Sequence, residues 1–539
     1  MTRVLAALLA VSCLADYAWA HQPVRGRHGM VVAEEPIAAK TGVAVLKAGG
    51  NAIDAAIAVA FTLAVTYPSA GNIGGGGFLL ARFPDGRTTF IDFREKAPQA
   101  ATRDMYLDAQ GKPTRDSIQG WRASAVPGTV RGLALAHRKY GRKRWSRLLA
   151  PAIQLARTGF PVPYSLAESL ASAQTSFAKG IETGDKLIQR DLARTLARIA
   201  RKPDDFYTGV TARQLAASMA KNGGLITPAD LKAYRPVERT PLTGSYKGFG
   251  ILTAPPPSSG GVGILQMLGV LEGSGYEKEG WNSAATIHYV AETMRRFYAD
   301  RSEYIGDPDF SKIPVKALIH PEYVRKLRST IDPNKVSTIT PGVIGPYEST
   351  ETTHFSIVDN KGTAVAVTYT LNGSYGSGVV APGLGFLLNN EMDDFAARPG
   401  SPNMFGLVQG ERNAIQPGKR PLSSMTPTIL TRNGKLYMVL GSPGGGRIIT
   451  AVLQTILNVV DFGMNVQDAI DAPRFHHQWM PDHLTLERGF SPDTTRLLER
   501  RGHKLNAIAG VGRVSAIVVD GGWLQGGADG RGYGKAEGF

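Results

Sequence analysis

The segment STETTHFSIVDNKGTAVAVTYTLN, residues 349–372, constrains the fold more than any other part of the chain. Its second half alternates hydrophobic residues with small or polar ones, and the sequence DNKG at 359–362 is typical of a tight turn. This pattern predicts two strands joined as a β-hairpin. At its leading edge, Thr352 and Thr353 follow Glu351 in a stretch rich in hydroxyl groups. Both threonines fit as ordinary β-branched strand residues, and the alternative is that Thr352 is a nucleophile.

The rest of the chain mixes helical and strand patterns. One predicted helix ends at Gly49-Gly50, and a second, apolar helix begins near Asn51 and stops before Pro68, followed by a glycine loop and a strand. Further helices are predicted within 129–158, 184–222, 284–304 and RIITAVLQTILNVVDFG, and short strands in GFLLNN, PTILTRNGKLYMVLG and SAIVVDGGWLQGG. Strands in sheets with helices packed over them indicate a layered α+β protein.

Residues 1–20 have the pattern of a secretory signal peptide, with Arg3, an apolar stretch and the small-residue site AWA at 18–20. The mature chain is therefore expected to begin near His21 and to be periplasmic or secreted. Its one cysteine, Cys13, lies in the signal, so cysteine catalysis, disulfides and cysteine metal sites are excluded from the exported chain. Acylation of Cys13, as in a lipoprotein, is the alternative, but the residues before it form a poorer processing site. No other apolar run is long enough to span a bilayer.

The net charge of +16 is unchanged by removal of residues 1–20. The basic residues are scattered in groups such as RKRWSR and RLLERRG, without interleaved aromatic residues or a recognisable nucleic-acid-binding module. This distribution is typical of a solvated basic surface that suits small anionic substrates. It argues against nucleic acid as a partner.

Many short motifs occur in a fixed order along the chain. The first half contains GGNAIDAA, GNIGGGGF, DFREKAP, VPGTVRG, PPPSSGG and YADRSEYIGDP, and the second half contains TTHFSIVD, AVAVTYTLN, LLNNEMDDF, GKRPLSSM, GSPGG and APRFHHQW. From about residue 27 to the C-terminus, the chain resembles the γ-glutamyltransferase (γ-glutamyl transpeptidase) family. The resemblance implies an N-terminal nucleophile hydrolase, a four-layer αββα sandwich made as a precursor that cuts itself before its nucleophile.

The resemblance places the cut at the bond between Glu351 and Thr352. Residues 21–351 then form a large subunit, and residues 352–539 form a small subunit that begins with the nucleophile. Cleavage gives Thr352 a free α-amino group, whose pKa near 8 allows it to accept the hydroxyl proton. The implied activity is transfer of γ-glutamyl groups from glutathione and similar compounds to water, amino acids or peptides, with no cofactor and no metal.

Acyl transfer also needs hydrogen-bond donors for the developing oxyanion. The loop GSPGGG lies between a predicted strand and a predicted helix, and the backbone amides of its glycines are not shielded by side chains. The resemblance assigns the oxyanion hole to Gly444 and Gly445. An ordinary tight turn is the alternative, whereas a phosphate-binding loop lacks its Gly-Lys-Ser ending. Thr370 is expected to hydrogen-bond the Thr352 hydroxyl, with a plain strand threonine as the alternative.

A γ-glutamyl group carries an α-carboxylate and an α-ammonium, so a selective site needs a cation and hydroxyls on one side and carboxylates on the other. The positions that match the family's substrate contacts supply both sets. We expect Arg94, Ser423 and Ser424 to bind the carboxylate, and Asn372, Glu391 and Asp394 to bind the ammonium. Taken singly, such an arginine is more often a surface ion-pair partner, such a pair of acidic residues is more often a solvated turn, and such a pair of serines is more often a capping pair.

Two further features bear on the site. His476 and His477 are not expected to bind metal, because adjacent strand residues point to opposite faces and no carboxylates of ligand spacing accompany them. Phe405 in SPNMFG stands where many bacterial members of the family have a tyrosine in a loop over the site. A lid of this kind is expected here, without a phenol to hydrogen-bond.

Two other classes of protein fit part of the pattern. A related acylase that cleaves glutaryl-type β-lactam amides would have the same fold and nucleophile. It should lack acidic residues that bind an α-ammonium group, so Asp394 argues against it. A noncatalytic exported binding protein needs no cleavable junction before Thr352.

Overall fold

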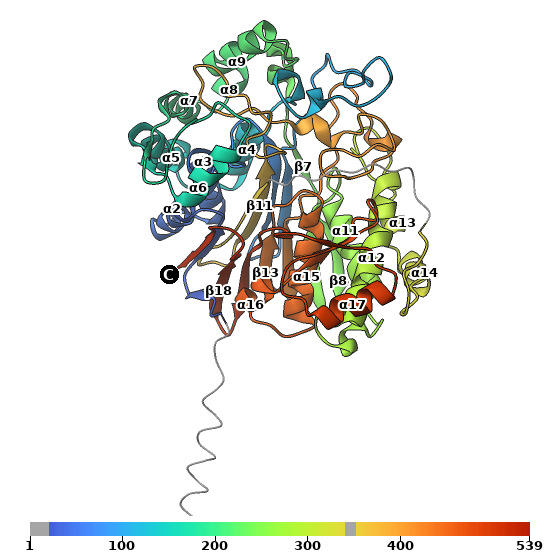
Figure 1. The fold of residues 1–539 in the computed structure, drawn as a ribbon. Coiled ribbons are helices and arrows are strands. Elements are labelled where there is room, and N and C mark those ends of the chain that lie inside the picture. Colours follow the sequence, from blue (N-terminus) through green and yellow to red (C-terminus); the bar gives the residue numbers. More distant parts are fainter. Residues whose placement is uncertain (1–20, 340–351) are drawn as a thin grey trace, which may run out of the picture.

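Two antiparallel β-sheets lie between two layers of α-helices (Figure 1). The structure is a computed structural model that describes residues 21–339 and 352–539. The predicted signal peptide and the chain leading to Glu351 lie outside the described residues. This layering confirms the predicted α+β class and the αββα sandwich.

The first sheet, here called the hairpin sheet, has the predicted hairpin near its centre. Its strand order is β19-β2-β10-β11-β3-β4-β7, and all neighbouring strands are antiparallel. Its strands are β2 (Met30–Ala33), β3 (Gly76–Arg82), β4 (Thr88–Asp92), β7 (Val237–Arg239), β10 (Thr353–Val358), β11 (Ala364–Thr370) and β19 (Lys535–Gly538).

The second sheet packs face to face against the hairpin sheet, with β17 over β10 and β13 over β11. Its order is β1-β18-β17-β13-β12-β9-β8. Its strands are β1 (Val24–Gly26), β8 (Leu242–Tyr246), β9 (Phe249–Thr253), β12 (Thr428–Arg432), β13 (Lys435–Gly441), β17 (Ser515–Asp520) and β18 (Trp523–Ala528). Two smaller sheets contain β5 (Phe160–Pro161) with β6 (Lys186–Leu187), and β14 (Phe475–His476), β15 (Leu484–Leu486) and β16 (Leu505–Ala507).

One helical layer covers the hairpin sheet and the other covers the second sheet, on the left and right of Figure 1 respectively. The first comprises α2 (Pro36–Lys47), α3 (Ala52–Thr66), α4 (Thr129–Tyr140), α5 (Trp145–Thr158), α6 (Tyr164–Ser172), α7 (Arg190–Arg201), α8 (Asp205–Thr208), α9 (Val210–Lys221) and α10 (Pro228–Ala233). The second comprises α11 (Gly260–Leu271), α12 (Ala284–Tyr304), α13 (Val315–Leu318), α14 (Pro321–Ser329), α15 (Arg447–Val460), α16 (Val466–Asp471) and α17 (Pro492–Arg500).

Helix α3 shows why the apolar pattern after Asn51 predicts a buried helix. Every residue of α3 is buried, between the hairpin sheet and the helices outside it. Asn51 Oδ1 accepts a hydrogen bond from the amide of Asp54, and Asp54 Oδ2 accepts one from the amide of Asn51, which is a complete capping box. No helix in residues 21–339 or 352–539 has both the length and the apolar composition needed to cross a membrane.

The two faces of the hairpin meet different surroundings. Phe355 and Val367 join the hydrophobic core under the first helical layer. His354 points to the opposite face, where its ring packs against Gly441 of β13. Since side chains alternate along a strand, Thr352 faces the second sheet as His354 does. The alternation in the sequence therefore reflects one apolar face and one face of small or polar residues between the sheets.

Strands from both sides of the predicted cleavage bond alternate within both sheets. In the hairpin sheet, β2 lies between β19 and β10, and β11 pairs with β3. In the second sheet, β1 pairs with β18 and β9 pairs with β12. The chain before residue 340 and the chain after residue 351 are therefore joined by backbone hydrogen bonds along several strands.

Some predicted elements differ from the structure. The sequence GFLLNN does not form a strand, because the amide of Leu388 donates to Val379 and that of Asn390 to Leu371, in separate segments. The predicted helix at 129–158 is interrupted at 141–144, after Gly141 ends α4 in an extended conformation. Residues 184–189 precede α7 as β6 and irregular structure rather than as helix.

Cleavage between Glu351 and Thr352 should leave the two pieces in one particle under native conditions, because their separation would break strand pairing in both sheets. Gel filtration of the cleaved protein should give a single peak, and a denaturing gel of the same fraction should give two bands. Elution of the pieces as separate native species would contradict the shared sheets.

Candidate active site

Thr352 lies immediately before β10, in the space between the sheets, and is 4% exposed. The register of the hairpin pairs Thr353 with Tyr369, which brings Thr352 beside Thr370. The Oγ1 atoms of Thr352 and Thr370 are 3.4 Å apart, and Thr370 Oγ1 accepts a 2.8 Å hydrogen bond from the amide of Asn372. Strand pairing therefore places Thr370 next to Thr352, as the sequence predicts.

A cavity of about 20 Å³ lies beside Thr352. That volume holds about one water molecule. The residues predicted from the sequence line this cavity with one exception, Gly444. The predicted residues in its wall are Arg94, Thr352, Thr370, Asn372, Glu391, Asp394, Ser423, Ser424 and Gly445. Segments that are far apart in the sequence, on both sides of the predicted cleavage bond, thus meet at one point.

The glycine loop lies between β13 and the N-terminal end of α15. Gly445 has φ +55°, and a Cβ atom there would lie 2.7 Å from the Phe405 ring. Gly444 has φ +134°, which L side chains rarely adopt. Within the described part of the chain, the amides of Gly444 and Gly445 donate to no protein acceptor. Both amides are therefore available to a ligand near a helix N-terminus.

Arg94 lies shortly after β4 and is 1% exposed. Its Nε donates to the carbonyl oxygen of Pro421 at 3.2 Å, and its Nη2 donates to that of Leu422 at 3.1 Å. These bonds fix the guanidinium beside the segment that carries the two predicted serines. The same guanidinium also forms ion pairs with Glu391 and Asp394.

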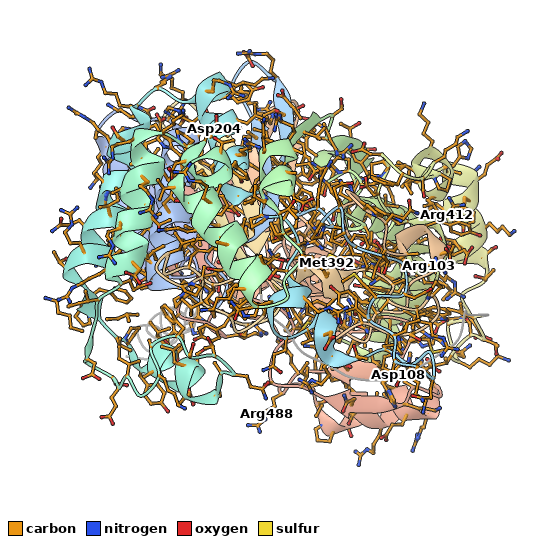
Figure 2. All side chains as sticks on the ribbon, turned by 90° about the horizontal axis from the view of Figure 1, so that it is seen from above. Arg103, Asp108, Asp204, Met392, Arg412 and Arg488 are labelled. Carbon is orange, nitrogen blue, oxygen red and sulfur yellow. The ribbon has the colours of Figure 1, made fainter. Side chains whose placement is uncertain are left out.

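These ion pairs differ from the predicted arrangement, in which Arg94 and the carboxylates bind opposite ends of a substrate. Glu391 and Asp394 belong to the short 3-10 helix η4 (Glu391–Asp394), whose Met392 is labelled near the middle of Figure 2. Burial raises the pKa of the Glu391 carboxyl well above its usual range and also raises that of Asp394, with Arg94 partly offsetting both effects. The site therefore concentrates charges of both signs that neutralise one another.

The two serines present hydroxyl groups to the cavity. Ser423 Oγ accepts a hydrogen bond from the amide of Met425 at 3.1 Å. Ser424 Oγ accepts one from Arg301 Nη2 at 3.2 Å. Both oxygens are thus fixed by donors from the protein.

Phe405 forms part of the cavity wall and is 7% exposed. Its loop is held by two bonds to η4: Asn403 Nδ2 donates to Asp394 Oδ1 at 3.0 Å, and the Met404 amide donates to Asp393 Oδ2 at 2.8 Å. A phenyl ring therefore covers this side of the site.

Two buried charged residues of the site were missed by the sequence analysis. Glu95 is fully buried, and its Oε2 lies 3.8 Å from Arg94 Nη1. Neither of its carboxylate oxygens has a hydrogen-bond partner among the described residues, and burial raises its pKa to about 7. The second is Arg301 on α12, which is 2% exposed. Both residues lie in motifs quoted above, DFREKAP and YADRSEYIGDP, but no local pattern marks them as buried.

The histidine pair lies apart from the cavity wall, and His476 has protein partners on both ring nitrogens. His476 Nδ1 is 2.9 Å from Thr450 Oγ1, and its Nε2 is 2.9 Å from Gln478 Oε1. Burial lowers the pKa of His476 to about 3. Across residues 21–339 and 352–539, no group of three or more His, Cys, Asp or Glu side chains is arranged to hold a metal ion.

Sequence comparison relates this site to known proteins. A sequence model described as Gamma-glutamyltranspeptidase matches residues 38–539. A glutathione hydrolase proenzyme of Escherichia coli (strain K12) is 50% identical over 534 residues, which cover 96% of this chain and 91% of that protein.

The similar solved structures include an acylase and a gamma-glutamyltranspeptidase. The crystal structure of a cephalosporin acylase from Bacillus halodurans has a TM-score of 0.86 at 29% identity, over 97% of this chain and 98% of that chain. A gamma-glutamyltranspeptidase from Pseudomonas nitroreducens complexed with L-DON has a TM-score of 0.55 at 44% identity, over 56% of this chain and 94% of that chain. The chain therefore belongs to the gamma-glutamyltranspeptidase family.

Proposed function

We propose that this protein transfers γ-glutamyl groups from glutathione and other γ-glutamyl compounds to water, amino acids or peptides, through an ester on Thr352. The observation that carries the proposal is the meeting, at one cavity, of this threonine, a glycine amide and buried charges of both signs. Family membership and the identity to a glutathione hydrolase proenzyme support it.

The nucleophile is created by cleavage of the bond between Glu351 and Thr352. The new α-amine of Thr352 accepts the Oγ1 proton as that oxygen attacks the γ-carbonyl carbon, and the neighbouring Thr370 orients the hydroxyl. Cleavage yields a large subunit, residues 21–351, and a small subunit, residues 352–539. With residues 1–20 as the signal, the mature enzyme acts in the periplasm or outside the cell.

Attack on the γ-carbonyl places negative charge on its oxygen. The free amides of Gly444 and Gly445 are the donors for this oxyanion, and the N-terminus of the 14-residue helix α15 adds partial positive charge. Collapse of the intermediate breaks the carbon–nitrogen bond, and the leaving amine takes the proton from the Thr352 α-amine. Water or an acceptor amine then attacks the ester and regenerates the Thr352 hydroxyl.

The charge cluster matches the two charges of a γ-glutamyl group. Arg94 forms ion pairs with both Glu391 and Asp394. A bound substrate brings a carboxylate for Arg94, Ser423 and Ser424 and an ammonium for the acidic pair and Asn372. Arg94, Glu391 and Asp394 then each keep an oppositely charged partner, which avoids the free-energy cost of an unpaired buried ion. Since the cavity is only about 20 Å³, entry of the substrate requires these ion pairs to open.

Glutaryl acylase activity is the second candidate, favoured by the TM-score of 0.86 with the cephalosporin acylase. A glutaryl group has no ammonium. Once Arg94 turns to its carboxylate, Glu391 and Asp394 are left buried without a positive partner, which is unfavourable. The buried acidic pair therefore favours γ-glutamyl donors.

Thr352→Ala should remain uncut and inactive, because it lacks the hydroxyl that we assign to both self-cleavage and γ-glutamyl transfer. The matched control is Thr353→Ala, which removes a hydroxyl with no hydrogen-bond partner among the described residues, on the opposite face of β10. A denaturing gel, N-terminal sequencing of the small piece, and release of aniline from a γ-glutamyl anilide with and without glycylglycine provide the measurements. An active, uncut chain, or a small piece that begins at another residue, would refute the nucleophile assignment.

Asp394→Asn should reduce kcat/KM for a γ-glutamyl anilide by roughly thirtyfold to several thousandfold, a loss of about 2–5 kcal/mol, because the substrate ammonium loses a buried charged partner. A glutaryl anilide, which lacks the ammonium, should be affected much less. Asp393→Asn is the matched control, since Asp393 is buried in the same 3-10 helix but bonds Ser117 and the Met404 amide instead of lining the cavity. Equal losses for both anilides in Asp394→Asn, with complete cleavage, would contradict the γ-glutamyl assignment.

Glu95→Gln should make the protein less sensitive to alkaline pH. Burial raises the pKa of Glu95 from an ordinary 4.5 to about 7, so between these values the folded state holds a proton that the unfolded state has lost. The resulting stability is present below pH 4.5 and is lost as pH rises through 7. The free energy of unfolding can be measured with urea for the variant and for wild type at pH 5 and pH 8. The value for the variant minus that for wild type should be higher at pH 8 than at pH 5 by about 1–3 kcal/mol. Glu322→Gln, on a side chain that is 79% exposed, should show no such rise, and an equal rise there would contradict the prediction.

A further inference from the structure

Arg301 stands directly behind the serine pair but does not line the cavity. It projects from α12, which lies beside α11 in the right-hand helical layer of Figure 1. Its Nη2 donates to Ser424 Oγ at 3.2 Å, and its Nε donates to Ser259 Oγ at 2.9 Å. Ser259 Oγ in turn donates to the carbonyl oxygen of Ser423 at 2.8 Å. One guanidinium thus holds both serines, one directly and one through Ser259.

The direction of these hydrogen bonds follows from the chemistry of arginine. A guanidinium has donors and no acceptor, so Ser424 Oγ must accept from it. The hydroxyl proton of Ser424 is then left to donate elsewhere. Ser423 Oγ likewise accepts from the Met425 amide, which leaves its own proton to donate. Both hydroxyls at the cavity are therefore set as donors, and a pair of donors selects a group that only accepts, such as a carboxylate.

The positive charge of Arg301 also differs from that of Arg94. Arg94 is held in ion pairs with Glu391 and Asp394, whereas Arg301 forms no ion pair with any described residue. Its Nη1 is buried and has no hydrogen-bond partner in the described ranges, 21–339 and 352–539. Burial lowers the pKa of Arg301 to about 10, so it is still protonated at neutral pH. Positive potential behind the serines is therefore present before any ion pair opens.

We propose that Arg301 is a positioning residue that orients the Ser424 hydroxyl as a donor and holds the backbone of Ser423 through Ser259, so that both serines face the substrate α-carboxylate and the site is specific for donors that carry this group. The inference rests on the proposed γ-glutamyl transfer. It adds a large-subunit residue to a contact that the small-subunit serines make. The planar fork of its guanidinium bonds two different serines at once, Ser259 and Ser424.

The test compares two γ-glutamyl anilides, one with its α-carboxylate and one in which that carboxylate is a neutral amide. Arg301→Met should lower kcat/KM for the carboxylate donor roughly 10- to 100-fold, mainly by raising KM, because charge-assisted donors are lost. The amide donor should change less than about threefold, since it gains little from a donor-only pair. Arg301→Lys, which keeps the charge, should recover part of the loss on the carboxylate donor.

Arg296→Met is the matched control, because Arg296 is a buried arginine of the same helix that bonds Glu292 and Thr330 rather than the serines. It should change both donors by the same factor. Ser259→Ala gives an independent test that keeps the guanidinium, and it should slow the carboxylate donor by a few fold and leave the amide donor unchanged. Ser259→Ala and Arg301→Lys also decide the matter if Arg301→Met does not fold or cleave.

Equal factors for the two donors in fully cleaved Arg301→Met, or in Ser259→Ala, would overturn the positioning role while leaving γ-glutamyl transfer intact. Wild-type protein that releases aniline from neither donor would instead overturn the proposed function itself. The two failures are therefore distinguishable in the same assay.

Discussion

The antiparallel pairing of β10 with β11 is the constraint on which the site depends. Its register sets Thr352 beside Thr370, and its alternation of side chains turns both toward the second sheet. Because strands pair with both edges of this hairpin, and the second sheet packs on one face and helix α3 on the other, a one-residue slip would move the apolar residues out of the core. The position of Thr352 is thus fixed by the burial of a whole sheet, and a loop carrying the same threonine could not hold it as rigidly.

Electrostatic balance is the second organising principle. Arg94, Glu391 and Asp394 are buried together, where any one of them alone would be costly. Their mutual ion pairs balance these buried charges, and a zwitterionic group is the kind of ligand whose two charges can replace those pairs. Glu95, 3.8 Å from Arg94, and Arg301 are two further buried ionisable residues beyond the cavity wall.

Strands from the two sides of the proposed cleavage bond alternate within both sheets, and this arrangement bears on how the uncleaved chain can already hold the site together. Before any cleavage, segments from both sides of the Glu351–Thr352 bond already share hydrogen bonds within each sheet. The site draws Arg94 and Arg301 from one side of that bond and the acidic pair and serines from the other. Cutting the bond can therefore expose an α-amine at Thr352 without dismantling the site around it, because the surrounding contacts do not rely on the continuity of the chain there.

The sequence by itself determined the elements with strong local patterns, such as the capped apolar helix α3, helix α12 and the β10–β11 hairpin. Its motifs also contain the residues that line the cavity. Periodicity, capping and turn chemistry are local properties, so they can be read without the fold. Only the tertiary structure decided the order of strands in the sheets, the loss of a strand at GFLLNN, the pairing of Arg94 with the acidic residues, and the burial and contacts of Glu95 and Arg301. Each of these depends on which distant segments become neighbours and which charges are buried, and neither property is encoded in any short stretch of the chain.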